Sequence, residues 1–152
     1  MRKLFRWSIA AAALVLLAAQ FIRPARTNPV FDPSRALAAA HPMPPDVADV
    51  FQRACRDCHS NETRWPWYSH LAPVSWFVID HVNHGRSHFN ASDWSSYEPD
   101  EAARLLKELC ELAREQAMPL RSYTLIHRSA ALTSADVSAL CAWTAHGSRG
   151  QP

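Results

Sequence analysis

The segment Cys55-Arg56-Asp57-Cys58-His59 limits what this chain can fold into more than any other part of the sequence. Two cysteines separated by two residues, with a histidine directly after them, form the attachment signature of a c-type haem. This spacing lets both thiols add to the vinyl groups of one haem while the histidine turns back to the iron. The sequence therefore predicts one covalent haem, haem c, held by Cys55, Cys58 and His59.

Three other uses of a Cys-x-x-Cys pair compete with this interpretation: a thioredoxin-like redox site, half of a zinc site and a structural disulfide. A thioredoxin-like site belongs in a βαβ setting, and the chain has no strand pattern to supply one. Zinc requires a second cysteine pair, whereas Cys110 and Cys141 stand apart. The histidine directly after Cys58, in a chain that begins like an exported protein, favours the haem.

The N-terminal segment has the pattern of an export signal. Basic residues in the segment 1–6 precede an apolar run of 16 residues, Trp7 to Ile22, in which only Ser8 and Gln20 are polar. Small-residue sites such as Ala18-Ala19 would permit cleavage, as in a signal peptide that is removed.

The end of the apolar run favours a retained single-pass anchor over a cleaved signal. The segment Gln20-Phe21-Ile22-Arg23-Pro24 supplies an interfacial aromatic residue and a basic stop in place of a clean small-x-small site. The basic residues before the run place the N-terminus in the cytoplasm and the rest of the chain on the periplasmic face of the cytoplasmic membrane. We therefore expect residues 1–22 to form a hydrophobic signal or anchor helix.

The distribution of charge excludes one large class of partner. Five of the 16 basic residues lie before Asp32, the first acidic residue. Removing these five leaves 11 basic against 14 acidic residues, so the net charge after the leader is near −3. No basic patch of the kind that binds nucleic acid remains, and no nucleic-acid partner is expected.

The rest of the chain divides into a linking segment and one domain. Residues 23–45 contain six prolines, a spacing that prevents a long helix and predicts an extended tether. The haem-binding domain is expected over residues 46–147. Because the sequence shows no strand pattern and no internal repeat, the predicted fold class is all-α.

Four helices are expected in this domain from the spacing of its apolar residues. They cover residues 46–54, 74–82, 99–117 and 133–147. The first should run directly into Cys55, and Gly85 is placed to end the second as its C′ residue. A hydroxyl of Thr133 or Ser134 is expected to cap the last helix, which should stop at Gly147.

Met118 is the predicted sixth ligand of the iron, so the predicted metal ligands are His59 and Met118. Met118 follows the 99–117 helix, precedes Pro119 and lies 59 residues past His59. The proline makes the backbone leave the helix, which can direct the thioether at iron from a rigid loop. The alternative is a core methionine that fills a gap, the commonest use of this residue. The other internal methionine, Met43, lies in the tether.

The remaining histidines can be explained without a role as iron ligands. His70, after an aromatic cluster, is the strongest alternative axial ligand, although capping or packing is the simpler role. His81, His84 and His88 have a spacing that would share one helical face, but Gly85 is expected to break the helix between them. We therefore expect hydrogen-bonding histidines near the haem edge and no second metal site.

Two further pairs have alternative interpretations. Arg64 and Arg86 lie among the aromatic residues and would suit haem propionates, because guanidinium binds a carboxylate bidentately, but ordinary solvated arginines fit equally well. Cys110 and Cys141 each lie on a buried helical face. They form either a disulfide between the last two helices or two small buried apolar side chains, and their spacing does not decide.

The chain resembles the bacterial haem-binding domain family in a series of motifs that occur in the same order. The resemblance extends from about Gln20 to Trp143. It rests on the motifs Cys55-x-x-Cys58-His59-Ser60-Asn61, Arg64-Trp65-Pro66-Trp67-Tyr68, Pro73-Val74-Ser75-Trp76 and Met118-Pro119-Leu120, and on the stretches 81–90 and 123–127.

This resemblance implies haem binding, a cytochrome c-like helical fold and association with respiratory or peroxidase-type cytochromes. It supplies no known reaction. At matching positions it implies attachment through Cys55, Cys58 and His59, with Met118 as the sixth ligand.

Two functions from different classes remain. The first is a one-electron carrier, because a His and Met pair keeps iron six-coordinate and leaves no site for substrate; its partners would be periplasmic or membrane redox proteins. The second is a haem enzyme or sensor, peroxidase-like or gas- or redox-sensing, with an open or labile sixth position. The sequence offers a sixth ligand and no convincing catalytic acid–base pair, which favours the carrier over an enzyme.

Overall fold

The computed structural model describes residues 1–147 of the 152 residues. Over these residues the chain is helical and has no strand, which confirms the predicted all-α class. The α-helices are α1 (Arg2–Ala19), α2 (Leu37–Ala40), α3 (Pro45–Ala54), α4 (Arg56–His59), α5 (Val74–His88), α6 (Pro99–Arg114), α7 (Arg121–Thr124) and α8 (Ser134–Gly147). The 3-10 helices are η1 (Pro33–Arg35), η2 (Trp67–His70), η3 (Ala91–Ser96) and η4 (Arg128–Ala130).

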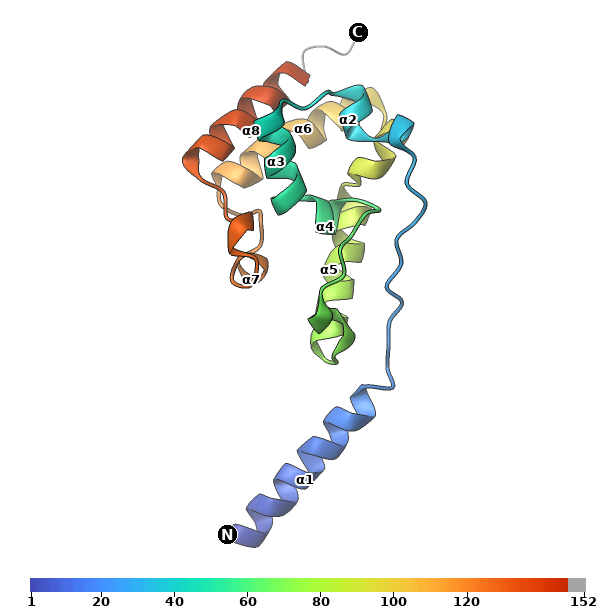
Figure 1. Cartoon of the computed structure of the whole chain (residues 1–152), viewed down its shortest axis with the longest axis vertical. Coiled ribbons are helices and arrows are strands. Elements are labelled where there is room, and N and C mark those ends of the chain that lie inside the picture. Colours follow the sequence, from blue (N-terminus) through green and yellow to red (C-terminus); the bar gives the residue numbers. More distant parts are fainter. Residues whose placement is uncertain (148–152) are drawn as a thin grey trace.

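Helix α1 extends away from the rest of the chain and buries none of its residues (Figure 1). None of the helices within residues 1–147 is both long enough and apolar enough to cross a membrane. The expected membrane-spanning helix is therefore not supported. The apolar run was expected to be helical to Ile22, whereas α1 ends at Ala19 and includes the basic Arg2, Lys3 and Arg6.

The core lies where α6 and α8 pack together, with α3 against α8 (Figure 1). Helix α6 buries the apolar face that its periodicity predicts, and Pro99 occupies its first position as expected. At the start of α8, Thr133 Oγ accepts a hydrogen bond from the backbone N–H of Asp136, and the Asp136 carboxylate accepts from the backbone N–H of Thr133. The apolar cluster of the core consists of Leu37, Val47, Phe89, Ala91, Trp94, Ala102, Leu105, Leu106, Ala113, Leu140 and Trp143.

Cys110 of α6 and Cys141 of α8 form a disulfide, which decides between the two interpretations that their spacing left open. The bond joins residues that are 31 positions apart, across the most extensive helix pair of the fold. A crosslink of this kind stabilises mainly by restricting the unfolded chain.

Replacing both cysteines, in Cys110→Ala/Cys141→Ala, is expected to lower the free energy of unfolding by about 3–4 kcal/mol, the value for a closed loop of this length. Urea denaturation of the variant and of the wild type would measure the difference. Adding a reductant to both proteins is the control. It should lower the unfolding midpoint of the wild type alone, so that the two denaturation curves coincide. Equal midpoints under oxidising conditions would contradict a stabilising crosslink.

Helix α6 is terminated by a backbone hydrogen-bond motif and not by Pro119. The helix ends at Arg114, and Gln116 takes a left-handed conformation with φ 56°. The N–H of Ala117 donates to the carbonyl of Leu112, and the N–H of Gln116 to that of Ala113, which is the Schellman pattern. The helix therefore stops earlier than the expected 117, and Met118 lies in the segment that follows this cap.

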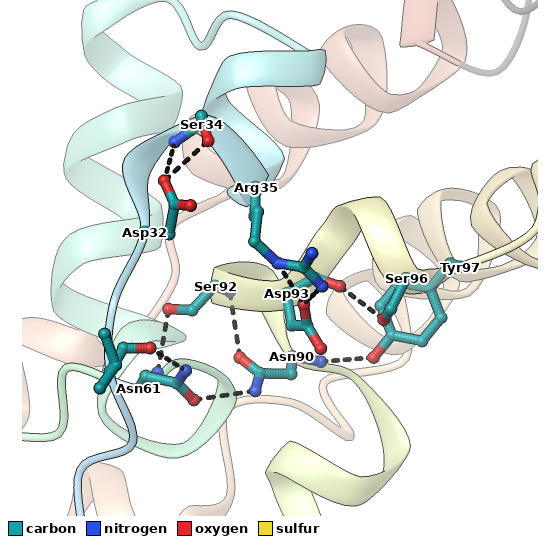
Figure 2. A network of polar contacts seen from close by, with 10 residues as sticks. Asp32, Ser34, Arg35, Asn61, Asn90, Ser92, Asp93, Ser96 and Tyr97 are labelled. Atoms are coloured by element: carbon teal, nitrogen blue, oxygen red, sulfur yellow. Dashed lines mark hydrogen bonds and ion pairs between the residues drawn. The ribbon is translucent and has the colours of Figure 1, made fainter.

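The segment expected to be an extended tether is partly folded onto the domain. It contains η1 and α2, and Leu37 of α2 is buried in the core. Two contacts hold it: Arg35 pairs with Asp93, as Figure 2 shows. The Asn61 side chain also donates to the carbonyl of Val30. Folded structure thus begins before the expected residue 46, because Leu37, which lies between the prolines, is buried in the core.

Candidate functional site

The predicted attachment segment directly follows α3 and contains the single-turn helix α4. Helix α3 ends at Ala54, directly before Cys55, which confirms the short helix expected there. The N–H of His59 then donates to the carbonyl of Cys55 at 3.0 Å, closing the single turn of α4. The backbone of this segment thus sets the relative positions along the turn of the residues that carry the two thiols and the imidazole.

One nitrogen of the His59 imidazole already forms a hydrogen bond. Its Nδ1 lies 3.0 Å from the carbonyl oxygen of Phe89, which can only accept, so Nδ1 carries the proton. The lone pair is then on Nε2, the arrangement that proteins use to orient a metal-binding histidine. Burial lowers the pKa of His59, which favours the neutral form that binds metal.

The two thiols of the segment are free and protonated. Burial raises the pKa of Cys55 to about 12 and that of Cys58 to about 11. A thioredoxin-like site works through a thiolate with a lowered pKa, so this environment argues against that alternative. Within residues 1–147, no group of three or more His, Cys, Asp or Glu side chains is arranged to hold a metal ion.

Gly85 has a different role from the one expected. Helix α5 continues through it to His88, so Gly85 does not end the helix. A Cβ atom at this position would lie 2.6 Å from the backbone oxygen of Cys58. Glycine is therefore required because α5 and α4 approach closely, and this contact supports the attachment turn from behind.

Replacing Gly85 with Ala is expected to destabilise the fold by about 2–3 kcal/mol, because the added methyl group meets backbone and cannot be absorbed by a flexible side chain. Thermal or urea denaturation measures this loss. Asn83→Ala, at an exposed position of the same helix, is the control and should have little effect. If Gly85→Ala unfolded at the wild-type midpoint, the close helix contact would be contradicted.

Two adjoining hollows lie beside the attachment turn. Cys55, His59 and Met118 all contribute to the first, which has a volume of about 640 Å³ including its open mouth. Cys58, His59 and Met118 all contribute to the second, of about 1000 Å³ on the same measure. The fold thus places all four residues predicted for the site around one region, although Met118 is distant from the others in sequence.

The walls of the first hollow are almost entirely apolar. Helices α6 and α8 and the loop between them supply Leu105, Leu109, Leu112, Leu132 and Leu140. Leu109 and Leu112 are only partly buried in this structure, and both line the hollow. A pre-formed apolar wall with a few polar groups at one side is typical of a cofactor site.

The histidines of α5 lie beside the second hollow. His81, His84 and His88 all contribute to its wall. The expectation that a helix break at Gly85 would separate them is wrong, because α5 is continuous and keeps them on neighbouring turns. His70 is exposed in η2 and lines neither hollow, so the structure does not bring it to the predicted iron ligands.

A cluster of aromatic and polar side chains on the other side of Cys58 was not singled out as a site from the sequence. The Tyr123 hydroxyl donates to the Asp57 carboxylate at 2.9 Å, and the Tyr123 ring stacks on His127. Nε2 of His127 lies 2.7 Å from the hydroxyl of Tyr68. Burial raises the pKa of Tyr123, so its hydroxyl remains a donor. The family motifs covered these residues, Tyr68 in the stretch 64–68 and Tyr123 and His127 in the stretch 123–127, without indicating that they meet.

Arg86 does not face the hollows as a partner for propionates. Its guanidinium donates to the carbonyls of Ser60 and Thr27 and to side-chain oxygens of Asn28 and Thr63. The bonds to Thr27 and Asn28 tie the linking segment to the domain, and those to Ser60 and Thr63 hold α5 against the residues that follow α4. The suggested propionate role of Arg86 is therefore not supported, because its donors are already used.

The helical fold and the apolar hollows with two thiols, an imidazole and a thioether at their walls define a helical haem-binding protein. A model of the haem-binding domain family matches residues 14–146, and the chain belongs to this family. No curated protein and no solved structure matches the chain.

Proposed function

We propose that the protein is an exported c-type haem protein that transfers single electrons, with iron held between His59 and Met118. One observation carries the proposal: His59 and Met118 line the same two hollows, and each of the cysteines lies on the wall of one of them. A His and Met pair occupies both axial positions and raises the reduction potential, which suits a carrier.

The residues around the hollows fit this cofactor. Cys55 and Cys58 would each add an S–H group across one vinyl double bond: a carbon–sulfur bond forms, the hydrogen goes to the neighbouring carbon, and no electron is gained or lost. When bound, haem supplies a one-electron iron couple. The Phe89 carbonyl holds the imidazole of His59, and the leucines of α6 and α8 exclude water.

The location proposed for this activity is the periplasmic side of the cytoplasmic membrane. The basic start of the leader and the apolar run after it support export. The negative net charge after the leader suits brief docking with redox partners of that compartment. Cell fractionation tests the location, and the N-terminal residue of the recovered chain shows whether the leader is removed near residue 20.

A haem enzyme or sensor is the second candidate, and one observation favours it. His81, His84 and His88 line the second hollow together with Met118, so groups able to exchange protons lie near the proposed sixth ligand. In that case Met118 would be absent from the iron or would leave it on reduction.

An optical spectrum of the haem-loaded protein separates the two candidates. The carrier requires a ferric low-spin spectrum with a sulfur-to-iron charge-transfer band and no response to cyanide or peroxide. A high-spin ferric spectrum that shifts on adding either ligand would contradict the carrier and support the enzyme or sensor.

A further inference from the structure

Apolar side chains are exposed together where η2 leads into α5. Trp67 is 75% exposed, Phe77 is 50% exposed, and Leu71 and Val74 are similarly accessible. These four residues, named here the apolar corner, occupy a single turn of η2, the loop after it and the first turn of α5. Exposed apolar residues that gather in this way mark a contact surface more often than scattered ones do.

The end of the leader is attached to the same place. The side-chain amide of Gln20 donates to the carbonyl of Ala72 and accepts from its N–H, both at 3.0 Å. The indole N–H of Trp76 donates to the carbonyl of Ile22 at 2.8 Å. Phe21, 89% exposed, is therefore held beside the apolar corner and extends it.

The residues that follow the leader do not act as a spacer. The guanidinium of Arg26 donates to the carbonyl of Ser69, and the side chain of Asn28 donates to that of Thr63. Arg86 adds a bond to the carbonyl of Thr27. Because consecutive residues are bound to the domain, the apolar corner keeps a defined position next to the end of α1 and cannot swing away from it.

We propose that the apolar corner rests on the surface of a lipid bilayer, with Phe21, Trp67 and Phe77 at the level of the headgroups. A bilayer is the occupant because the corner adjoins α1, none of whose residues is buried, and the apolar side chains of both need the same apolar surroundings. An aromatic residue at the end of an apolar run, here Phe21, followed by a basic residue, here Arg23, is typical of a membrane interface. The proposal rests on the proposed export of the chain to that membrane.

Hydroxyl-radical footprinting of the full chain tests this seating residue by residue. The chain is oxidised in buffer and with vesicles of phosphatidylcholine and phosphatidylglycerol, and the modified residues are quantified by mass spectrometry. We expect oxidation of Trp67, Leu71 and Phe77 to fall severalfold with vesicles. Val30, 92% exposed on the linking segment, is the internal control and should not change.

Each outcome decides a different claim. If the leader is protected and the apolar corner is not, the corner faces solvent or a protein partner, and this inference is overturned while export stands. If neither is protected, the membrane location in the proposed function fails as well. In the variant Trp67→Ser/Leu71→Ser, whose side chains are exposed and should not affect folding, protection of Val74 and Phe77 should be lost while the leader stays protected. Unchanged protection there would overturn the inference.

Discussion

The variant Cys55→Ala/Cys58→Ala is expected to lose all covalently bound haem, because no thiol remains to form a bond to either vinyl group. Each single variant should keep at most one such bond. Haem staining after denaturing electrophoresis measures this directly, since only covalent haem stays with the chain. Both cysteines lie on the walls of the hollows that also contain His59, so the loss should leave the helical content of the protein unchanged.

The disulfide offers a matched control for this experiment. Cys110→Ala/Cys141→Ala also removes two cysteines, but they join α6 to α8 and line neither hollow. This variant should be less stable and should still stain fully for haem. Full staining of the Cys55→Ala/Cys58→Ala variant would contradict covalent attachment through the predicted pair.

The variant Met118→Ala should open the sixth position of the iron. The ferric spectrum is expected to change toward high spin, the reduction potential to fall, and peroxidase-like activity to rise, because an axial thioether is lost. If a histidine takes its place, the structure favours one of the α5 histidines of the second hollow, His81, His84 or His88, over His70, which lines neither hollow. Optical spectra and a redox titration measure both changes.

Met43→Ala is the control for the methionine experiment. Met43 packs against the apolar core and lines neither hollow, so its loss should lower stability without changing the spectrum. If Met118 were only a core residue, Met118→Ala would behave in the same way, with a loss of about 2–5 kcal/mol and an unaltered ferric spectrum. That result would exclude the methionine ligand and remove the main support for a dedicated electron carrier.

Local interactions explain which features were predictable from the sequence. The face of α6, its start at Pro99 and the hydroxyl cap of Thr133 depend on residues within a few positions of one another, so the spacing alone determined them. The same is true of the turn from Cys55 to His59, where one helical turn sets the relative position of both thiols and the imidazole. The orientation of the His59 ring, in contrast, depends on the carbonyl of Phe89, 30 positions later.

Only the tertiary structure decided the features that depend on distant segments. Gly85 has the local pattern of a helix end, but its absent side chain makes room for the backbone of Cys58, 27 positions earlier. The bonds of Gln20 and Arg86 turn a proline-rich segment into a fixed attachment. Met118 lies near His59 because α6, capped at Gln116, returns the chain to the attachment turn. Contacts of this kind depend on how the helices pack. The spacing of apolar residues along the sequence shows which face of a helix is buried but not which other helix it contacts.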